Sequence, residues 1–170
     1  MSRKKEDMFG DVNLEITATS EADTQHLAAT LAPLAEVGDI IALSGDLGTG
    51  KTVFARAFIN TLGENREVPS PTFTLVQSYY LNPTTVHHFD LYRLEKSEDA
   101  FELGIEELFV DGISLIEWPE RLGSFLPMDR LNLIFSYSTH LSGTTTTRQI
   151  KINGPRSWQS RINNAFQKHD

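Results

Sequence analysis

The stretch Leu43–Thr52, LSGDLGTGKT, decides the fold of this chain. It contains three glycines and ends in a lysine followed by a threonine. Glycine allows backbone N–H groups to approach a ligand closely because it has no side chain and tolerates unusual backbone angles. A lysine and a hydroxyl residue at the end of such a loop are the groups that bind phosphate and its metal ion. The stretch therefore predicts a loop that binds a phosphorylated ligand.

The stretch satisfies the phosphate-loop pattern G-x-x-x-x-G-K-[ST] in full. The apolar run before it, residues 39–45, is typical of a buried parallel strand, and residues 51–63 after it have helical periodicity with Gly63 as the expected end. A plain glycine-rich turn is the alternative, and the strand–loop–helix context favours phosphate binding. Lys51 is expected to reach the β- and γ-phosphates, and the Thr52 hydroxyl to bind Mg²⁺. The predicted cofactor-binding residues of the loop are Gly45, Asp46, Leu47, Gly48, Thr49, Gly50, Lys51 and Thr52.

Helical and strand patterns alternate along the rest of the chain. Ser20 is a plausible helix cap, with Asp23 three residues later, and Ser97 is expected to cap a second helix. This order predicts an α/β fold of the P-loop NTPase type, with a mixed, mainly parallel sheet flanked by helices and with antiparallel strand pairs. The predicted strands are residues 11–19, 39–45, 73–81, 85–94, 112–118, 130–138 and 145–154, and the predicted helices are 20–35, 51–63, 97–109 and 157–169.

Composition limits the domain organisation and the cellular setting. A chain of 170 residues is long enough for one well-buried domain, so we predict a flexible tail over residues 1–10 and a single P-loop ATPase domain over residues 11–170. The sequence has no cysteine and no apolar run near the roughly 18 residues of a membrane span. A cytoplasmic protein is expected. The net charge of −8 opposes nucleic acid, so any role on RNA is expected to depend on a partner.

Two carboxylates are candidates for the chemistry of a nucleotide site. Glu117 ends the apolar run ISLIE, and Asp90 ends the run VHHFD. A P-loop NTPase usually holds Mg²⁺ with an acidic residue at the end of a neighbouring buried strand. One carboxylate is expected to bind the metal and the other to orient the attacking water, but their spacing does not assign these roles. On its own, each is also consistent with an exposed carboxylate at the rim of a strand.

Other polar and aromatic residues have open alternatives. Thr72, in the segment SPTF, is a candidate sensor of the γ-phosphate or an ordinary loop residue before a strand. Trp118 is able to stack on a base, but a packing role is more usual for tryptophan. The adjacent His87 and His88 point in opposite directions on a strand, which argues against a two-histidine metal site. Three arginines are candidates for stabilising transferred charge, although a surface salt bridge is the more usual role: Arg56, Arg93 and Arg121.

The segments LSGDLGTGKT, SPTFTLVQSYY, HHFDLYRL, ELGIEELF and ISLIEWPERL occur in this order, and together they resemble the TsaE (YjeE) family. The phosphate loop alone is unspecific, whereas DLYRL followed by IEWPERL is quite specific. The likeness begins near residue 11 and runs through the IEWPERL segment. By motif, it assigns phosphate and Mg²⁺ binding to Lys51 and Thr52, a switch-like role to Thr72, an essential carboxylate to Asp90, metal binding to Glu117 and a functional role to Trp118.

The resemblance also implies a function. It implies a bacterial ATPase required for N6-threonylcarbamoyladenosine at position 37 of tRNA, which binds the TsaD–TsaB transferase pair and uses ATP and Mg²⁺ to reset that complex. Contact with tRNA is then expected only through the partners. We expect weak turnover without them, with an arginine or the positioning of water supplied by the partner, as with arginine fingers. A small-molecule kinase and a nucleotide-gated binding module with negligible hydrolysis are the alternatives.

Overall fold

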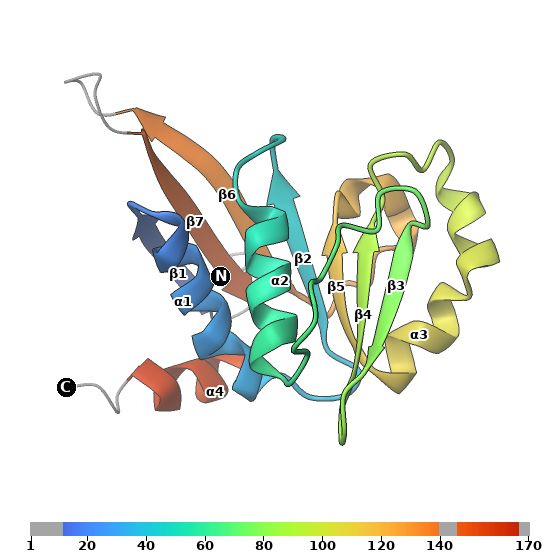
Figure 1. The fold of residues 1–170 in the computed structure, drawn as a ribbon, viewed down its shortest axis with the longest axis horizontal. Coiled ribbons are helices and arrows are strands. Elements are labelled where there is room, and N and C mark those ends of the chain that lie inside the picture. Colours follow the sequence, from blue (N-terminus) through green and yellow to red (C-terminus); the bar gives the residue numbers. More distant parts are fainter. Residues whose placement is uncertain (1–11, 140–145, 167–170) are drawn as a thin grey trace, which may run out of the picture.

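The computed structural model describes residues 12–139 and 146–166, which form one seven-stranded sheet with helices packed against it (Figure 1). The strands lie in the order β1-β7-β6-β2-β5-β4-β3. The predicted tail, residues 1–10, lies outside the described residues. The strands are β1 (Val12–Ala18), β2 (Ile40–Gly45), β3 (Val76–Tyr80), β4 (Thr85–Asp90), β5 (Ile113–Glu117), β6 (Leu131–Thr139) and β7 (Thr146–Gly154).

The centre of the sheet is parallel and its margins are antiparallel. Strand β2 pairs in parallel with β5 and β6, and β4 pairs in parallel with β5. The pairs β3·β4, β6·β7 and β1·β7 are antiparallel. The predicted fold class is therefore confirmed. Because parallel strands present their carboxyl ends at one edge of a sheet, the ends of β2, β4 and β5 meet there, which is where open α/β sheets bind ligands.

Helices cover the sheet on both faces. Figure 1 shows α1 and α2 side by side in front of the sheet, and together with α4 they enclose a core that contains Phe54, Phe58 and Trp158. A second core lies on the other face, where Phe89 and Ile116 pack under α3 and the 3-10 helices η2 and η3. The helices are α1 (Glu21–Leu31), α2 (Lys51–Thr61), α3 (Ile105–Asp111) and α4 (Arg156–Phe166), and the 3-10 helices are η1 (Ala32–Leu34), η2 (Ser97–Leu103) and η3 (Pro119–Phe125).

The first helix begins as the sequence predicts. The Ser20 hydroxyl accepts from the backbone N–H of Asp23, and the Asp23 carboxylate accepts from the backbone N–H of Ser20, which completes a capping box. Beyond the end of α2, Gly63 adopts a positive φ of 124°. Such a residue lets the chain leave a helix at little cost, but the cap itself is Leu62, one residue before the predicted Gly63.

The prediction of one continuous helix over residues 97–109 is wrong, because the structure has two separate elements there. Residues 97–103 form the 3-10 helix η2, and Gly104, with φ of 71°, separates it from the short helix α3. Ser97 is the first residue of η2 and not its cap, because Lys96 occupies the cap position and no side chain bonds there. A glycine inside a helical pattern allowed the left-handed conformation that breaks the helix.

The predicted strands around residues 73–94 are longer than the observed ones. Strand β3 begins at Val76, after a turn in which Leu75 has a φ of 66°, and β4 ends at Asp90. Thr72 therefore lies in a loop, and Asp90 lies at a strand end. In the described part of the chain, no helix has the length and apolar character needed to cross a membrane.

Candidate functional site

The phosphate loop depends on glycines at its two ends. Gly45 ends β2 with a φ of 141°, and a β-carbon there would collide with the backbone oxygen of Phe135 on β6. Gly50 has a φ of 109° and immediately precedes α2. Within the loop, the hydroxyl of the buried Thr49 donates to the backbone oxygen of Asp46 over 2.7 Å. The loop therefore turns back tightly onto the first turn of α2, where free N–H groups favour an anion.

Lys51 is held at the mouth of this loop. Its ammonium group donates to the backbone oxygens of Gly45 and of Asp46, the latter at 2.9 Å, and lies 4.2 Å from the centre of the Trp118 ring. Burial lowers the pKa of Lys51, while the nearby Glu117 carboxylate opposes this change. The lysine is thus oriented by the loop and by an aromatic face, as an ammonium that meets phosphate should be.

Glu117 lies directly beside the threonine of the phosphate loop. The Thr52 hydroxyl donates to Glu117 Oε1 over 2.7 Å, and the Glu117 side chain is buried. The other carboxylate oxygen, Oε2, lies 2.7 Å from His88 Nε2. Strands β2 and β5 pair in parallel, with Leu43 opposite Glu117. This register brings Thr52 and Glu117 together although 65 residues separate them in the sequence. The sequence-predicted metal ligands Thr52 and Glu117 are therefore adjacent.

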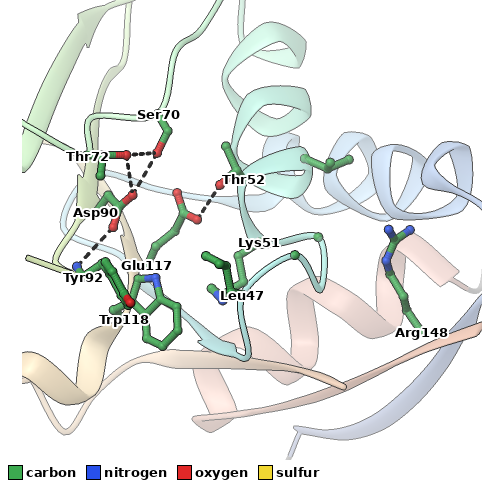
Figure 2. Close-up of a pocket in the computed structure, with 13 residues that line it drawn as sticks. Leu47, Lys51, Thr52, Ser70, Thr72, Asp90, Tyr92, Glu117, Trp118 and Arg148 are labelled. Atoms are coloured by element: carbon green, nitrogen blue, oxygen red, sulfur yellow. Dashed lines mark hydrogen bonds between the residues drawn. The ribbon is translucent and has the colours of Figure 1, made fainter. Parts of the chain in front are cut away.

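Asp90 lies on the neighbouring strand and is the register partner of Glu117. Its Oδ2 accepts hydrogen bonds from Ser70 Oγ at 2.9 Å and Thr72 Oγ1 at 3.2 Å, and its Oδ1 accepts from the backbone N–H of Tyr92 at 3.2 Å (Figure 2). The loop that contains Thr72 is thus tied to a carboxylate at the end of β4.

These groups line one cleft of about 250 Å³. In Figure 2, Asp90, Glu117 and Trp118 lie on one side of the phosphate loop, and Arg148 lies on the other. The half-buried Trp118 packs on Tyr92 with ring centres 4.9 Å apart, and its assignment to cofactor binding stays a prediction. The lining residues are Leu47, Gly48, Gly50, Lys51, Thr52, Val53, Ser70, Thr72, Asp90, Tyr92, Glu117, Trp118 and Arg148.

Four of the lining residues were not identified from the sequence: Val53, Ser70, Tyr92 and Arg148. Ser70 stands two residues before Thr72 in the segment SPTF, so its place in that segment was an available signal. Tyr92 follows Asp90 by two residues and therefore lies at the same end of β4. Arg148 belongs to a distant antiparallel strand and carried no motif, so only the sheet pairing brings it to the cleft.

The other arginine and histidine candidates have different surroundings. Arg56 donates to the backbone oxygen of Val68 over 2.6 Å, whereas Arg93 and Arg121 lie against the rings of Phe73 and Tyr92. Arg56, Arg93 and Arg121 do not line the cleft described above. His87 and His88 have separate partners, as their alternation on the strand predicts: His87 Nε2 contacts Asp111 at 2.5 Å, and His88 contacts Glu117.

The chemistry of the cleft fits Mg²⁺ with a nucleotide. Mg²⁺ prefers hard oxygen ligands and is usually held by one or two protein groups together with substrate phosphates and water. Thr52 and Glu117 provide a hydroxyl and a carboxylate at the end of the phosphate loop. Among the described residues, no group of three or more His, Cys, Asp or Glu forms a cage for a metal by itself. A metal here would therefore depend on the bound phosphates for its other ligands.

Comparisons with known proteins identify the family of this chain. Residues 18–150 match the family model described as "Threonylcarbamoyl adenosine biosynthesis protein TsaE". The TsaE protein of Rickettsia conorii is 44% identical over 120 residues, 69% of each chain, and that of Bacillus subtilis is 38% identical over 113 residues, 66% of this chain and 70% of that protein. The crystal structure of Bacillus subtilis YdiB superposes with a TM-score of 0.77 at 26% identity, covering 94% of this chain and 97% of that one. On the extent of the family match and the identity to these relatives, this chain belongs to the TsaE family.

Proposed function

We propose that this chain is a Mg²⁺-dependent ATPase that acts on the TsaD–TsaB transferase pair during the threonylcarbamoyladenosine modification of tRNA. Membership of the TsaE family supports a role in tRNA threonylcarbamoyladenosine biosynthesis. The finer parts of the proposal, which are ATP hydrolysis and the partner, depend on the chemistry of the cleft and on the charge of the molecule.

One observation carries the ATPase proposal: the hydrogen bond of 2.7 Å between Thr52 Oγ1 and Glu117 Oε1, at the end of a complete phosphate loop. In P-loop NTPases, a hydroxyl and a carboxylate so arranged hold the Mg²⁺ that bridges the β- and γ-phosphates. Lys51 binds the same phosphates. Mg²⁺ would offset the charge that develops on the transferred phosphoryl group.

The second carboxylate has the surroundings expected of a group that handles the attacking water. Asp90 is the register partner of Glu117 and bonds the hydroxyls of Ser70 and Thr72. A carboxylate tied to a loop hydroxyl is able to respond when a γ-phosphate draws that hydroxyl away, as switch loops do. We therefore assign metal binding to Glu117, water positioning to Asp90 and nucleotide sensing to Thr72.

A partner is part of the proposal for two reasons. The net charge of −8 disfavours a direct hold on tRNA, so the transferase pair would make that contact. Arg148 lines the cleft but lies on the opposite side of the phosphate loop from Asp90 and Glu117 (Figure 2). The other candidates, Arg56, Arg93 and Arg121, lie outside the lining, and an arginine supplied across an interface is a known way to complete such a site. Turnover by the chain alone is therefore expected to be slow.

Following the γ-phosphate of labelled ATP tests the proposal against its alternatives. An ATPase releases the label as inorganic phosphate in a Mg²⁺-dependent reaction. A small-molecule kinase would pass the label to an added pool of metabolites, and a nucleotide-gated module would bind ATP and leave the label in place. The variant Glu117→Gln is expected to remove the Mg²⁺-dependent release, and either of the other two patterns would reject the ATPase proposal.

A further inference from the structure

Arg148 is a half-buried cation in the cleft, and none of the predicted roles accounts for it. It lies on β7 and lines the cleft, and its Nε atom is buried without a hydrogen-bond partner among the residues that the structure describes. A buried polar group without a partner costs free energy, so such groups are normally satisfied by something. A bound ligand in the cleft is able to supply that partner.

The position of Arg148 is fixed by the hairpin of β6 and β7. The antiparallel register pairs Arg148 with Tyr137, and directly opposed residues on such strands share one face of the sheet. The Tyr137 hydroxyl donates to the backbone oxygen of Gly48, and the Arg148 side chain lies 3.5 Å from where a β-carbon of Gly50 would be. The hairpin thus forms a wall against the end of the phosphate loop that leads into α2.

This wall is on the opposite side of the loop from the carboxylates. Figure 2 shows Asp90 and Glu117 on one side and Arg148 on the other. A nucleotide bound in the loop has its γ-phosphate at the Mg²⁺ ligands, Thr52 and Glu117. The α-phosphate and the nucleoside therefore extend away from Glu117, toward the side where Arg148 lies.

The chemistry of arginine fits that end of a nucleotide. Its planar guanidinium remains charged, donates to phosphate oxygens and stacks on aromatic faces. The cleft is lined by two cations, Lys51 and Arg148, and by two carboxylates, Asp90 and Glu117. Because Lys51 is assigned to the β- and γ-phosphates at the carboxylate end of the cleft, Arg148 is the lining cation that remains for the other end of the ligand.

We propose that Arg148 binds the nucleoside monophosphate end of the nucleotide, with its guanidinium plane on the base and its Nε–H toward an α-phosphate oxygen. This role rests on the proposed nucleotide site and adds to it a residue that reads the base end of the ligand. It also assigns a function to the β6–β7 hairpin, which closes the cleft on the side away from the reaction.

Two probes separate this role from a general effect on the loop. The affinities of the wild-type protein and Arg148→Met for Mg²⁺·ADP and for Mg²⁺·pyrophosphate are measured by calorimetry. Pyrophosphate uses the phosphate loop and Lys51 but has no nucleoside. We expect Arg148→Met to weaken ADP binding about tenfold and to weaken pyrophosphate binding, which keeps only the contact to phosphate, by a clearly smaller factor. Arg148→Lys, which keeps the charge and loses the plane, should recover only part of the ADP affinity.

The remaining outcomes are distinguishable. Equal losses for both probes would mean that Arg148 does not contact the nucleoside, and unchanged ADP binding would mean that it does not touch the nucleotide; either overturns the proposal. Failure of the wild-type protein to bind either probe would overturn the nucleotide site itself, and the Arg148 role with it. Arg66→Met is the matched control, because its exposed guanidinium pairs with Glu64 outside the cleft. Thermal unfolding of each variant checks that the fold is kept.

Discussion

His88 Nε2 lies 2.7 Å from Glu117 Oε2, and both side chains are buried. An ionised carboxylate only accepts hydrogen bonds, so the imidazole donates through Nε2 when Glu117 carries its charge. The other oxygen of Glu117 accepts from Thr52. The carboxylate assigned to Mg²⁺ is therefore held from two directions, by the phosphate loop and by a histidine on the neighbouring strand β4.

His88 is accordingly predicted to set the affinity for Mg²⁺. Groups that orient a metal ligand typically contribute 10–100-fold to metal affinity, so His88→Leu should raise the Mg²⁺ concentration needed for nucleotide binding by about tenfold or more. His88→Gln keeps a hydrogen-bond donor and should raise the required Mg²⁺ concentration less than His88→Leu does. Titration of Mg²⁺ at fixed ADP, followed by calorimetry, measures the effect. His87→Gln, on the opposite face of the strand, is the control, and an unchanged Mg²⁺ requirement in His88→Leu would refute the role.

Asp90 is predicted to be needed for ATP hydrolysis but not for ATP binding. Asp90→Asn keeps the shape of the side chain and its contacts with Ser70 and Thr72 but removes the charge. We expect ATP affinity within a few-fold of wild type and hydrolysis reduced by about 100-fold, the usual scale for a positioned carboxylate. Single-turnover hydrolysis with saturating ATP separates the two quantities, with the exposed Asp129→Asn as control. Normal hydrolysis in Asp90→Asn would remove this residue from the mechanism.

The two glycines Gly45 and Gly38 provide a matched test of the loop geometry. Both have a positive φ, but only Gly45 is so placed that a β-carbon would collide with the backbone, at Phe135. Gly38→Ala should lower the free energy of unfolding by about 1 kcal/mol, from backbone strain alone. Gly45→Ala should lower it by about 3 kcal/mol, because overpacking adds to the strain. Denaturant unfolding measures both, and equal losses would contradict the predicted collision.

Acid stability is predicted to depend on Glu64. Hydrogen bonds from the Arg66 side chain and backbone lower the pKa of Glu64 to about 2 from 4.5. A depressed pKa means that the carboxylate stabilises the fold fully above about pH 4.5 and loses this contribution as the pH falls toward 2. The difference in unfolding temperature between wild type and Glu64→Gln should thus be largest above pH 5 and shrink on acidification. A difference in unfolding temperature that grows as the pH falls would contradict the lowered pKa of Glu64. Glu67→Gln, an exposed neighbour, is the control.

The sequence predicted the parts of this site that are local. LSGDLGTGKT defines its own conformation through glycines, and the runs ending in Asp90 and Glu117 marked the strand ends. It did not predict Arg148, because that contact depends on how β6 and β7 pair and not on any neighbouring residue. Nor did spacing divide the roles of Asp90 and Glu117, because these roles depend on contacts made across the fold, of which the bond from Thr52 to Glu117 is one. The break between η2 and α3 had a visible signal, Gly104, that the helical pattern around it concealed.

We propose that the cleft hydrolyses ATP and that the transferase pair controls the rate. The most direct test of this proposal is the steady-state release of phosphate from Mg²⁺·ATP by the purified protein, alone and with TsaD–TsaB from the same source, with Lys51→Ala as the inactive control. We predict slow release by the protein alone and strong stimulation by the pair, absent in Lys51→Ala. Release that the pair leaves unchanged, although the proteins bind each other in an ATP-dependent way, would contradict the claim and favour a nucleotide-gated module.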